Sequence, residues 1–247
     1  MTSPEATQSS RLFILYFNVV REVVSSYCRE VRQLGFRLLG LISISLGLEE
    51  AYMATVLGEQ EQHMAVNYYP KCPAPELTYG LQAHTDPNAL TLLLQDPDVA
   101  GLQVRKDGKW IAVNPQPNAF VVNIGDQLQV SAYTSVAASL WSYAIIKSCL
   151  PEKLMKHGRH GLRRRMQALS NGRYRSVWHR AVVNADKERI SVASFLCPCN
   201  SAVISPPEKL VADGSPAMYR SYTYDEYYKK FWSRNLNDEH CLQLFRS

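Results

Sequence analysis

Three short motifs, far apart along the 247-residue chain, constrain its fold more than any other feature of the sequence. They are His84-Thr85-Asp86, Ser176-Val177-Trp178-His179-Arg180 and Arg189-Ile190-Ser191. In an extended strand, residues i and i+2 point to the same side of the backbone. Motifs with this spacing can therefore direct several polar side chains into one cavity if the segments that carry them lie in strands that face one another.

The residue types in these motifs are typical of an iron site. Two imidazoles and one carboxylate occupy one face of an octahedral non-haem Fe(II) ion and leave the other face open. This makes His84, Asp86 and His179 the candidate ligands. Arg189 offers a planar fork of donors for a carboxylate, the group that a 2-oxo acid would present.

Each of these residues also has an ordinary interpretation when it is taken alone. The histidines would serve as plain polar positions, Asp86 would suit the turn at Pro87-Asn88, and Arg189 would suit a surface ion pair. The occurrence of all four in one chain, in paired spacings, favours the metal site over these separate explanations.

The chain after residue 62 has the pattern of a mainly β domain. Short apolar or alternating runs occur at 64–69, 89–95, 102–105, 109–113, 119–124, 176–184 and 189–196. Turn signals separate them, and Asp107-Gly108 is typical of a hairpin. Many short strands with regular turns indicate a sandwich or jelly roll, an architecture that includes the cupins.

Helical patterns stand on both sides of this β region. Apolar residues recur at helical spacing from about 17 to 48, a short helix is expected at 48–57, and helix returns at 223–235 with an aromatic stripe. We interpret the stripe as core packing and expect residues 1–10 to fray. The predicted organisation is a helical segment at 1–62 and a β domain at 63–247.

Together, the motifs resemble one enzyme family. Asn67-Tyr68-Tyr69-Pro70, His84-Thr85-Asp86, the His179 motif and Arg189-Ile190-Ser191 occur in the order found in plant Fe(II)/2-oxoglutarate-dependent dioxygenases. The flavanone 3-dioxygenase-like and salicylate hydroxylase-like branch is the most similar. The resemblance implies a double-stranded β-helix, a jelly-roll variant with flanking helices, here incomplete.

The resemblance also implies a role for each matching residue. Metal ligands would be His84, Asp86 and His179, and the cosubstrate 2-oxoglutarate would be bound by Arg189, Ser191, Tyr69 and Asn67, with Phe195 lining the substrate pocket. It further implies Fe(II), 2-oxoglutarate and O2, with ascorbate as a candidate reductant. The implied reaction is hydroxylation of a flavanone or a phenolic acid such as salicylate, with succinate and CO2 as co-products.

Residues 130–167 depart from the family pattern. Asp86 and His179 are 93 positions apart, and removal of these 38 residues leaves 55, which suits the family. Val codons begin with GT and one Gln codon is CAG, so Val130 and Gln167 would fit the boundaries of a retained intron. The alternative is a genuine long loop, although loops of this length are uncommon in compact domains. We expect the segment to loop out, with apolar stretches at 137–140 and 143–146 left unburied.

The N-terminal region is a second departure, because family members carry roughly a hundred more residues there. We therefore expect 1–62 to be a truncated remnant. An alternative to the active enzyme follows from both departures: a catalytically inactive truncated or splice isoform without turnover.

The net charge of +5 suggests nucleic acid at first sight, but its distribution argues against that partner. Residues 130–167 hold seven basic residues against one acidic residue, so the rest of the chain carries −1. No apolar run reaches the roughly 18 residues of a membrane span. The six scattered cysteines fit a reducing compartment. We expect a cytoplasmic monomer acting on a small aromatic molecule, without nucleic acid or membrane partners.

Overall fold

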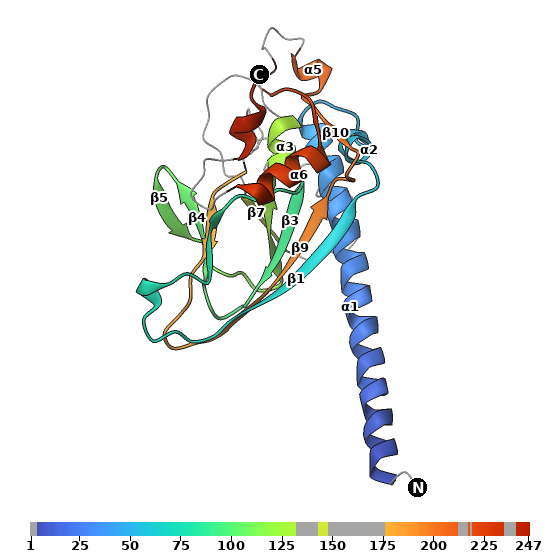
Figure 1. Ribbon diagram of the computed structural model, residues 1–247, viewed down its shortest axis with the longest axis vertical. Helices are drawn as coiled ribbons and strands as arrows, with labels where there is room; N and C mark the ends of the chain where they lie inside the picture. The colour runs from blue at the N-terminus through green and yellow to red at the C-terminus, as the bar shows by residue number, and fades with distance from the viewer. Residues whose placement is uncertain (1–3, 132–142, 148–175, 212–216, 218, 235–240) are drawn as a thin grey trace.

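The computed structural model describes residues 4–131, 143–147, 176–211, 217, 219–234 and 241–247, and shows β-sheets flanked by helices (Figure 1). Its strands are β1 (Glu61–Tyr69), β2 (Leu81–His84), β3 (Leu90–Gln95), β4 (Leu102–Lys106), β5 (Lys109–Ala112), β6 (Ala119–Ile124), β7 (Tyr143–Lys147), β8 (His179–Ala181), β9 (Arg189–Cys197), β10 (Val203–Ile204) and β11 (Tyr222–Thr223). Its helices are α1 (Pro4–Ser45), α2 (Tyr52–Leu57), α3 (Asp126–Ser131), α5 (Glu208–Val211) and α6 (Tyr224–Ser233), with 3-10 turns η1 (Pro75–Leu77) and η2 (Cys241–Phe245).

The strands form two main antiparallel sheets. The larger has the order β1-β9-β3-β6-β7 and the smaller has the order β2-β8-β4-β5, while β10 and β11 pair separately. Several sheet neighbours are distant in sequence, since β9 lies between β1 and β3 and β8 lies between β2 and β4. This confirms the predicted mainly β class with flanking helices.

Alternating residues of the larger sheet supply two separate apolar layers. One layer lies between the two main sheets and joins Leu93, Val121 and Ala193 of the larger sheet to Leu102 and Val104 of the smaller. Because successive side chains of a strand point to opposite faces, the intervening residues of the same strands face the other way. The inner layer therefore holds the two main sheets together face to face.

The second layer covers the outer face of the larger sheet. Leu90, Leu92 and Leu196 pack there against residues of α1, with Leu39 fully buried among them. Gly35 lets the helix approach closely, since a Cβ at this position would lie 2.8 Å from Leu196 Cδ2. Figure 1 shows α1 beside β9 and β1 and continuing past the end of the sheet. No helix of the described ranges is long and apolar enough to cross a membrane.

Two predicted boundaries were wrong. α1 begins at Pro4, well before the start expected at residue 17, whereas β8 covers only His179–Ala181 of the strand expected at 176–184. Helix length depends on contacts and propensity along the whole segment, and strand length depends on where a neighbouring strand offers hydrogen-bond partners. A pattern of single residues reports neither of these reliably.

Part of the 130–167 segment joins the larger sheet, which the sequence did not lead us to expect. β7 pairs antiparallel with β6, from Ala119 opposite Lys147 to Asn123 opposite Tyr143. The exposed edge of β6 offers unpaired backbone N–H and C=O groups, and an added strand satisfies them. The stretch at 143–146 therefore does not loop out. Residues 137–140 lie outside the described ranges.

Truncation of a leucine in the outer layer should destabilise the fold. Leu92 is 0% exposed, so Leu92→Ala should lower the free energy of unfolding by about 2–5 kcal/mol through lost burial and a residual cavity. Denaturant titration followed by circular dichroism measures this change. Leu244→Ala is the matched control, because Leu244 is 65% exposed. Equal losses in the two variants would contradict the assignment of this layer to the core.

Candidate metal centre

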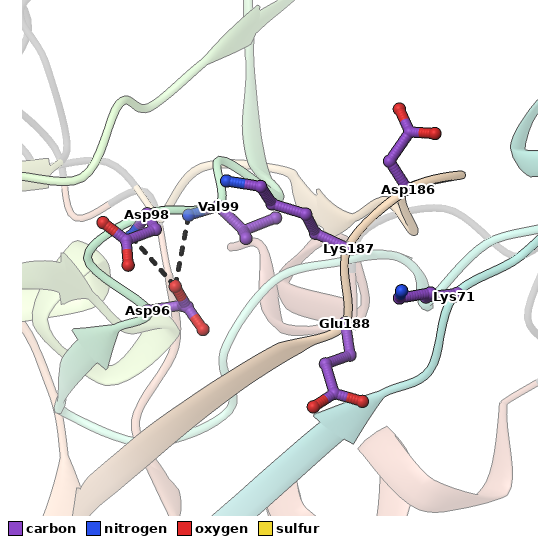
Figure 2. Close-up of a pocket in the computed structure, with 7 residues that line it drawn as sticks. All are labelled: Lys71, Asp96, Asp98, Val99, Asp186, Lys187 and Glu188. Carbon is purple, nitrogen blue, oxygen red and sulfur yellow. Dashed lines mark hydrogen bonds between the residues drawn. The ribbon is translucent and has the colours of Figure 1, made fainter.

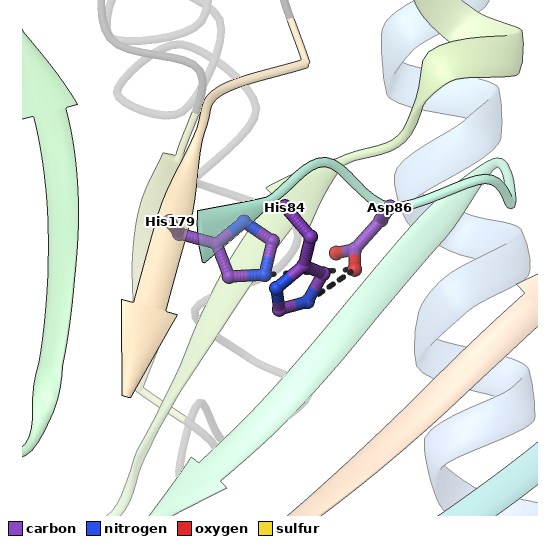
Figure 3. Close-up of side chains that lie close together, drawn as sticks. All are labelled: His84, Asp86 and His179. Atoms are coloured by element: carbon purple, nitrogen blue, oxygen red, sulfur yellow. Dashed lines mark ion pairs between the residues drawn. The ribbon is translucent and has the colours of Figure 1, made fainter. Parts of the chain in front are cut away.

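The ends of two paired strands bring the three candidate ligands together. His84 is the last residue of β2 and lies directly opposite His179, the first residue of β8, in the antiparallel ladder. Asp86 follows two residues after His84. The ligand atoms of all three side chains lie within 4.8 Å of one another (Figure 3). The sheet register thus assembles the predicted triad from residues 95 positions apart.

Both imidazole rings turn the same nitrogen toward a backbone carbonyl. His84 Nδ1 lies 2.8 Å from Gln82 O, and His179 Nδ1 lies 3.0 Å from Val177 O. A carbonyl oxygen only accepts hydrogen bonds, so each Nδ1 carries the proton and donates it. In the neutral rings Nε2 then keeps its lone pair, and a backbone partner of this kind is typical of histidines that bind metal.

Asp86 presents one carboxylate oxygen to both rings and uses the other for anchorage. Its Oδ1 lies 3.8 Å from His84 Nε2 and 3.5 Å from His179 Nε2. Thr91 Oγ1 donates to Asp86 Oδ2 at 2.7 Å, and Asn88 Nδ2 donates to Thr91 Oγ1 at 3.1 Å. The two polar neighbours fix the carboxylate so that a single oxygen faces the centre.

The environment disfavours the doubly protonated, charged form of the His84 ring. Asp86 and His179 are buried, and His84 is half-buried. Burial lowers the pKa of His84, and the neighbouring His179 imidazole lowers it further. A neutral imidazole is the form that binds a metal ion. The three side chains therefore match the donor set expected of a two-histidine, one-carboxylate iron site.

Arg189 is a buried cation that forms no ion pair at contact distance with the described residues, although the Asp96 carboxylate is near enough to raise its pKa. It is 3% exposed, its Nε has no hydrogen-bond partner there, and one of its terminal nitrogens donates to the neutral Gln95 Oε1 at 3.4 Å. Burial lowers its pKa. An unpaired buried charge costs several kcal/mol. A ligand carboxylate would satisfy this guanidinium, so the site fits a 2-oxo dicarboxylate.

The other candidate cosubstrate residues share one face of the β1–β9 pair. Tyr69 lies opposite Arg189, and Asn67 lies opposite Ser191. The Arg189 guanidinium carbon lies 5.1 Å from the centroid of the Tyr69 ring, which is a cation–π distance. Ser191 is 3% exposed and Asn67 is half-buried. The structure thus brings all four residues to one part of the sheet.

Phe195 lies on the same face of β9, deeper in the inner layer. It packs against the apolar cluster of Leu93, Val121 and Ala193, and its register partner on β3 is Thr91, which binds Asp86. Asn123 shares that inner face and lies opposite Thr91 from the β6 side. The buried Oδ1 of Asn123 has no hydrogen-bond partner in the described residues.

Sequence reasoning missed several residues that support these groups. Thr91 and Asn88 orient Asp86, Gln95 contacts Arg189, and Gly101 makes room for the guanidinium, since a Cβ there would lie 2.6 Å from Arg189 Cδ. The sequence carries no signal for them, because polar residues in strands and turns are common and their partners are set by tertiary structure.

An open depression lies where three loop segments meet (Figure 2). Its lining residues, most of them charged and of both signs, are Lys71, Asp96, Asp98, Val99, Asp186, Lys187 and Glu188. Asp96 Oδ1 accepts the backbone N–H groups of Asp98 at 2.9 Å and Val99 at 3.2 Å. Its acidic side chain therefore stabilises the local turn.

Comparison with known proteins agrees with this geometry. The profile of the 2OG-Fe(II) oxygenase superfamily matches residues 60–140 and 154–198. Flavanone 3-dioxygenase 2 of Oryza sativa subsp. japonica is 63% identical over 227 residues, which is 92% of this chain and 55% of that protein. Protein DOWNY MILDEW RESISTANCE 6 of Arabidopsis thaliana is 55% identical over 228 residues, 91% of this chain and 56% of that protein. The chain thus spans about half the length of these relatives.

Solved structures share the fold. JOX2 in complex with 2OG, Fe and JA superposes with a TM-score of 0.71 at 35% identity, over 92% of this chain and 57% of that one. The rice dioxygenase for auxin oxidation superposes with a TM-score of 0.67 at 27% identity, over 92% of this chain and 64% of that one.

Removal of the Thr91 hydroxyl should weaken metal binding. Thr91→Val keeps the shape of the side chain and deletes the donor to Asp86 Oδ2, and loss of such a partner typically costs about 10–100-fold in affinity. Anaerobic titration with Fe(II) measures the dissociation constant. Thr55→Val is the control, since Thr55 donates within α2, to Ala51 O. An unchanged dissociation constant in Thr91→Val would contradict the role assigned to this hydroxyl.

Proposed function

The chain belongs to the 2OG-Fe(II) oxygenase superfamily, and we propose that it hydroxylates a small aromatic plant metabolite, either a flavanone or a phenolic acid such as salicylate. The observation that carries this proposal is the cluster of His84, Asp86 and His179 together with the buried guanidinium of Arg189, whose Nε has no hydrogen-bond partner in the described residues. When bound, Fe(II) and 2-oxoglutarate supply an oxidation in which O2 is consumed, one oxygen atom enters the substrate, and succinate and CO2 leave.

The three side chains would hold the ion from one side. Both Nε2 atoms and Asp86 Oδ1 face a common point, while the backbone carbonyls of Gln82 and Val177 keep the rings in place. Three protein ligands on one face of an octahedron leave three positions for small molecules. Preorganised ligands of this kind need little rearrangement when the ion enters.

Arg189 and its neighbours provide the cosubstrate site in this proposal. The guanidinium would pair with the carboxylate of 2-oxoglutarate that is remote from the metal, and Ser191 and Tyr69 would add hydrogen bonds beside it, with Asn67 at the edge. The support is the burial of Arg189 with its Nε lacking a hydrogen-bond partner in the described residues. A bidentate bond would also orient the 2-oxo group toward the iron.

The apolar layer between the sheets supports an aromatic substrate. Phe195 borders that layer and lies opposite Thr91, one contact away from Asp86. An aromatic wall favours a flat apolar ligand and excludes water from the oxidation. The similarity to a rice flavanone 3-dioxygenase supports a flavanone, and the resemblance to salicylate hydroxylase-like enzymes supports a phenolic acid. We propose that the chain acts as a cytoplasmic monomer, with ascorbate as reductant.

Anaerobic titration with Fe(II) and 2-oxoglutarate should produce the visible charge-transfer band of the chelate. His179→Ala removes one ligand and should abolish the band. Arg189→Lys keeps the charge but loses the planar fork, so the dissociation constant for 2-oxoglutarate should rise about 10-fold, equivalent to about 1.4 kcal/mol. Arg105→Lys, on the exposed side of β4, is the control.

Measurement of succinate production then distinguishes the active enzyme from the inactive isoform. Production of succinate that depends on a flavanone or a phenolic acid supports the enzyme. A charge-transfer band with no production of succinate, whichever of these substrates is added, supports the inactive isoform. Absence of the charge-transfer band from the parent protein would contradict both the proposed metal site and the proposed cosubstrate site.

We also propose that residues 130–167 are an insertion within a domain spanning 63–247, beside a helical segment at 1–62. The spacing between Asp86 and His179 supports this division, although β7 shows that the insertion lends a strand to the larger sheet. A variant lacking 130–167 should keep the dissociation constants for Fe(II) and 2-oxoglutarate within about 3-fold of the parent, because the ligand strands lie outside it. Loss of both affinities with retained folding would contradict the division.

A further inference from the structure

The turn that carries Asp86 lies against residues 125–127, which directly follow β6. β3 and β6 pair antiparallel, and Leu90 opposite Ile124 is the last pair of that ladder. Beyond it, the chain on the β3 side is the turn 85–89, and the chain on the β6 side is Gly125-Asp126-Gln127 at the start of α3. The two short segments therefore meet at the end of the larger sheet, next to the metal centre.

Three backbone bonds join the two segments. They run from Gly125 N to Ala89 O at 2.8 Å, from Asp126 N to Asp86 O at 2.8 Å, and from Gln127 N to Asn88 O at 3.3 Å. The N–H groups at a helix start have no acceptor within the helix. Here the carbonyls of the turn serve as those acceptors, so one of the candidate ligands is held by its own main chain.

Side chains of the same residues add two further bonds. Thr85 Oγ1 donates to Asp126 Oδ2 at 3.2 Å, and Gln127 Nε2 donates to Pro87 O at 2.8 Å. Asp126 and Gln127 are 0% exposed and Thr85 is 1% exposed. Since Thr85 separates His84 from Asp86, its anchorage restrains the spacing between two ligands.

Gly125 is needed for this close contact. A Cβ at this position would lie 1.9 Å from Asn88 O and 2.6 Å from Asn88 C, and both of these are backbone atoms that cannot rotate away. Any larger residue would push the two segments apart.

Two tyrosines from the C-terminal part of the chain complete the contact from the far side. Tyr227 of α6 donates its hydroxyl to Asp126 Oδ2 at 2.5 Å, and Tyr222 of β11 donates to Gln127 Oε1 at 3.1 Å. Both rings are buried and stacked, with centroids 5.6 Å apart. Burial raises the pKa of Tyr227 well above its ordinary value, so the hydroxyl keeps the proton that it donates.

We propose that Gly125-Asp126-Gln127 is a positioning clamp for the metal-binding turn, and that Tyr227 and Tyr222 couple the C-terminal helix to the metal centre through it. None of these residues touches the ion or the substrate. They act through the backbone and Thr85, and thereby set where Asp86 and His84 lie relative to His179. The effect on metal affinity rests on the proposed function, whereas the clamp itself is a property of the fold.

Tyr227→Phe tests the clamp, because it deletes only the hydroxyl. Tyr228→Phe on the same helix is the matched control, since Tyr228 is 41% exposed. Two readouts are taken on the full chain: amide hydrogen exchange of residues 125–127 without metal, and the dissociation constant for Fe(II) under anaerobic conditions. Tyr227→Phe should accelerate exchange and raise the dissociation constant about 10-fold, and Tyr228→Phe should leave both unchanged.

Tyr222→Phe should produce smaller changes in the same direction. If circular dichroism shows that Tyr227→Phe does not fold, Tyr222→Phe takes its place in the test. Unchanged exchange in both variants would overturn the clamp. Faster exchange with unchanged metal affinity would overturn its positioning role and leave a purely structural contact. If the parent binds no Fe(II), the proposed function fails, and the exchange readout alone then decides whether the clamp exists.

Discussion

The pairing of β2 with β8 is the interaction on which the metal centre depends. It sets His84 opposite His179, and a slip of one residue would turn either imidazole to the other face of the sheet. β8 is only three residues long and is held on its other side by β4, where Val104 lies opposite His179. Few hydrogen bonds thus determine the ligand geometry. The bonds around Thr91 and residues 125–127 supply the stiffness that such a short strand cannot provide alone.

The candidate ligands could be predicted from the sequence because their chemistry is visible in residue type and spacing. Arg189 was predicted for the same reason, and the strands followed from alternation of apolar residues. Thr91 and Gln127 were not, because an ordinary polar residue reveals its partner only once distant segments meet. Tyr227 is the most instructive case. Its ring packs in the core, as the aromatic stripe of α6 predicted, yet its hydroxyl has a specific buried partner in Asp126.

The polar centre is built into the end of an apolar sandwich. β3 shows how one strand serves both purposes, since Leu92 faces α1 and Leu93 faces the other sheet, while Thr91 on the inner side carries the bond to Asp86. Exclusion of water from the inner layer strengthens each polar contact there. The same exclusion makes an unsatisfied polar group costly, which is why the buried Nε of Arg189 supports the proposal that this side chain binds a carboxylate.

The position of β9 between β1 and β3 has a consequence for biosynthesis. β1 and β3 are translated early, but the strand that joins them is translated more than ninety residues after β3 ends. Until then the nascent chain presents two strand edges with unsatisfied backbone groups and a half-built apolar layer, features that promote aggregation. High contact order of this kind slows folding. The larger sheet therefore cannot join β1 to its neighbours, and the chain stays open to aggregation, until β9 has left the ribosome.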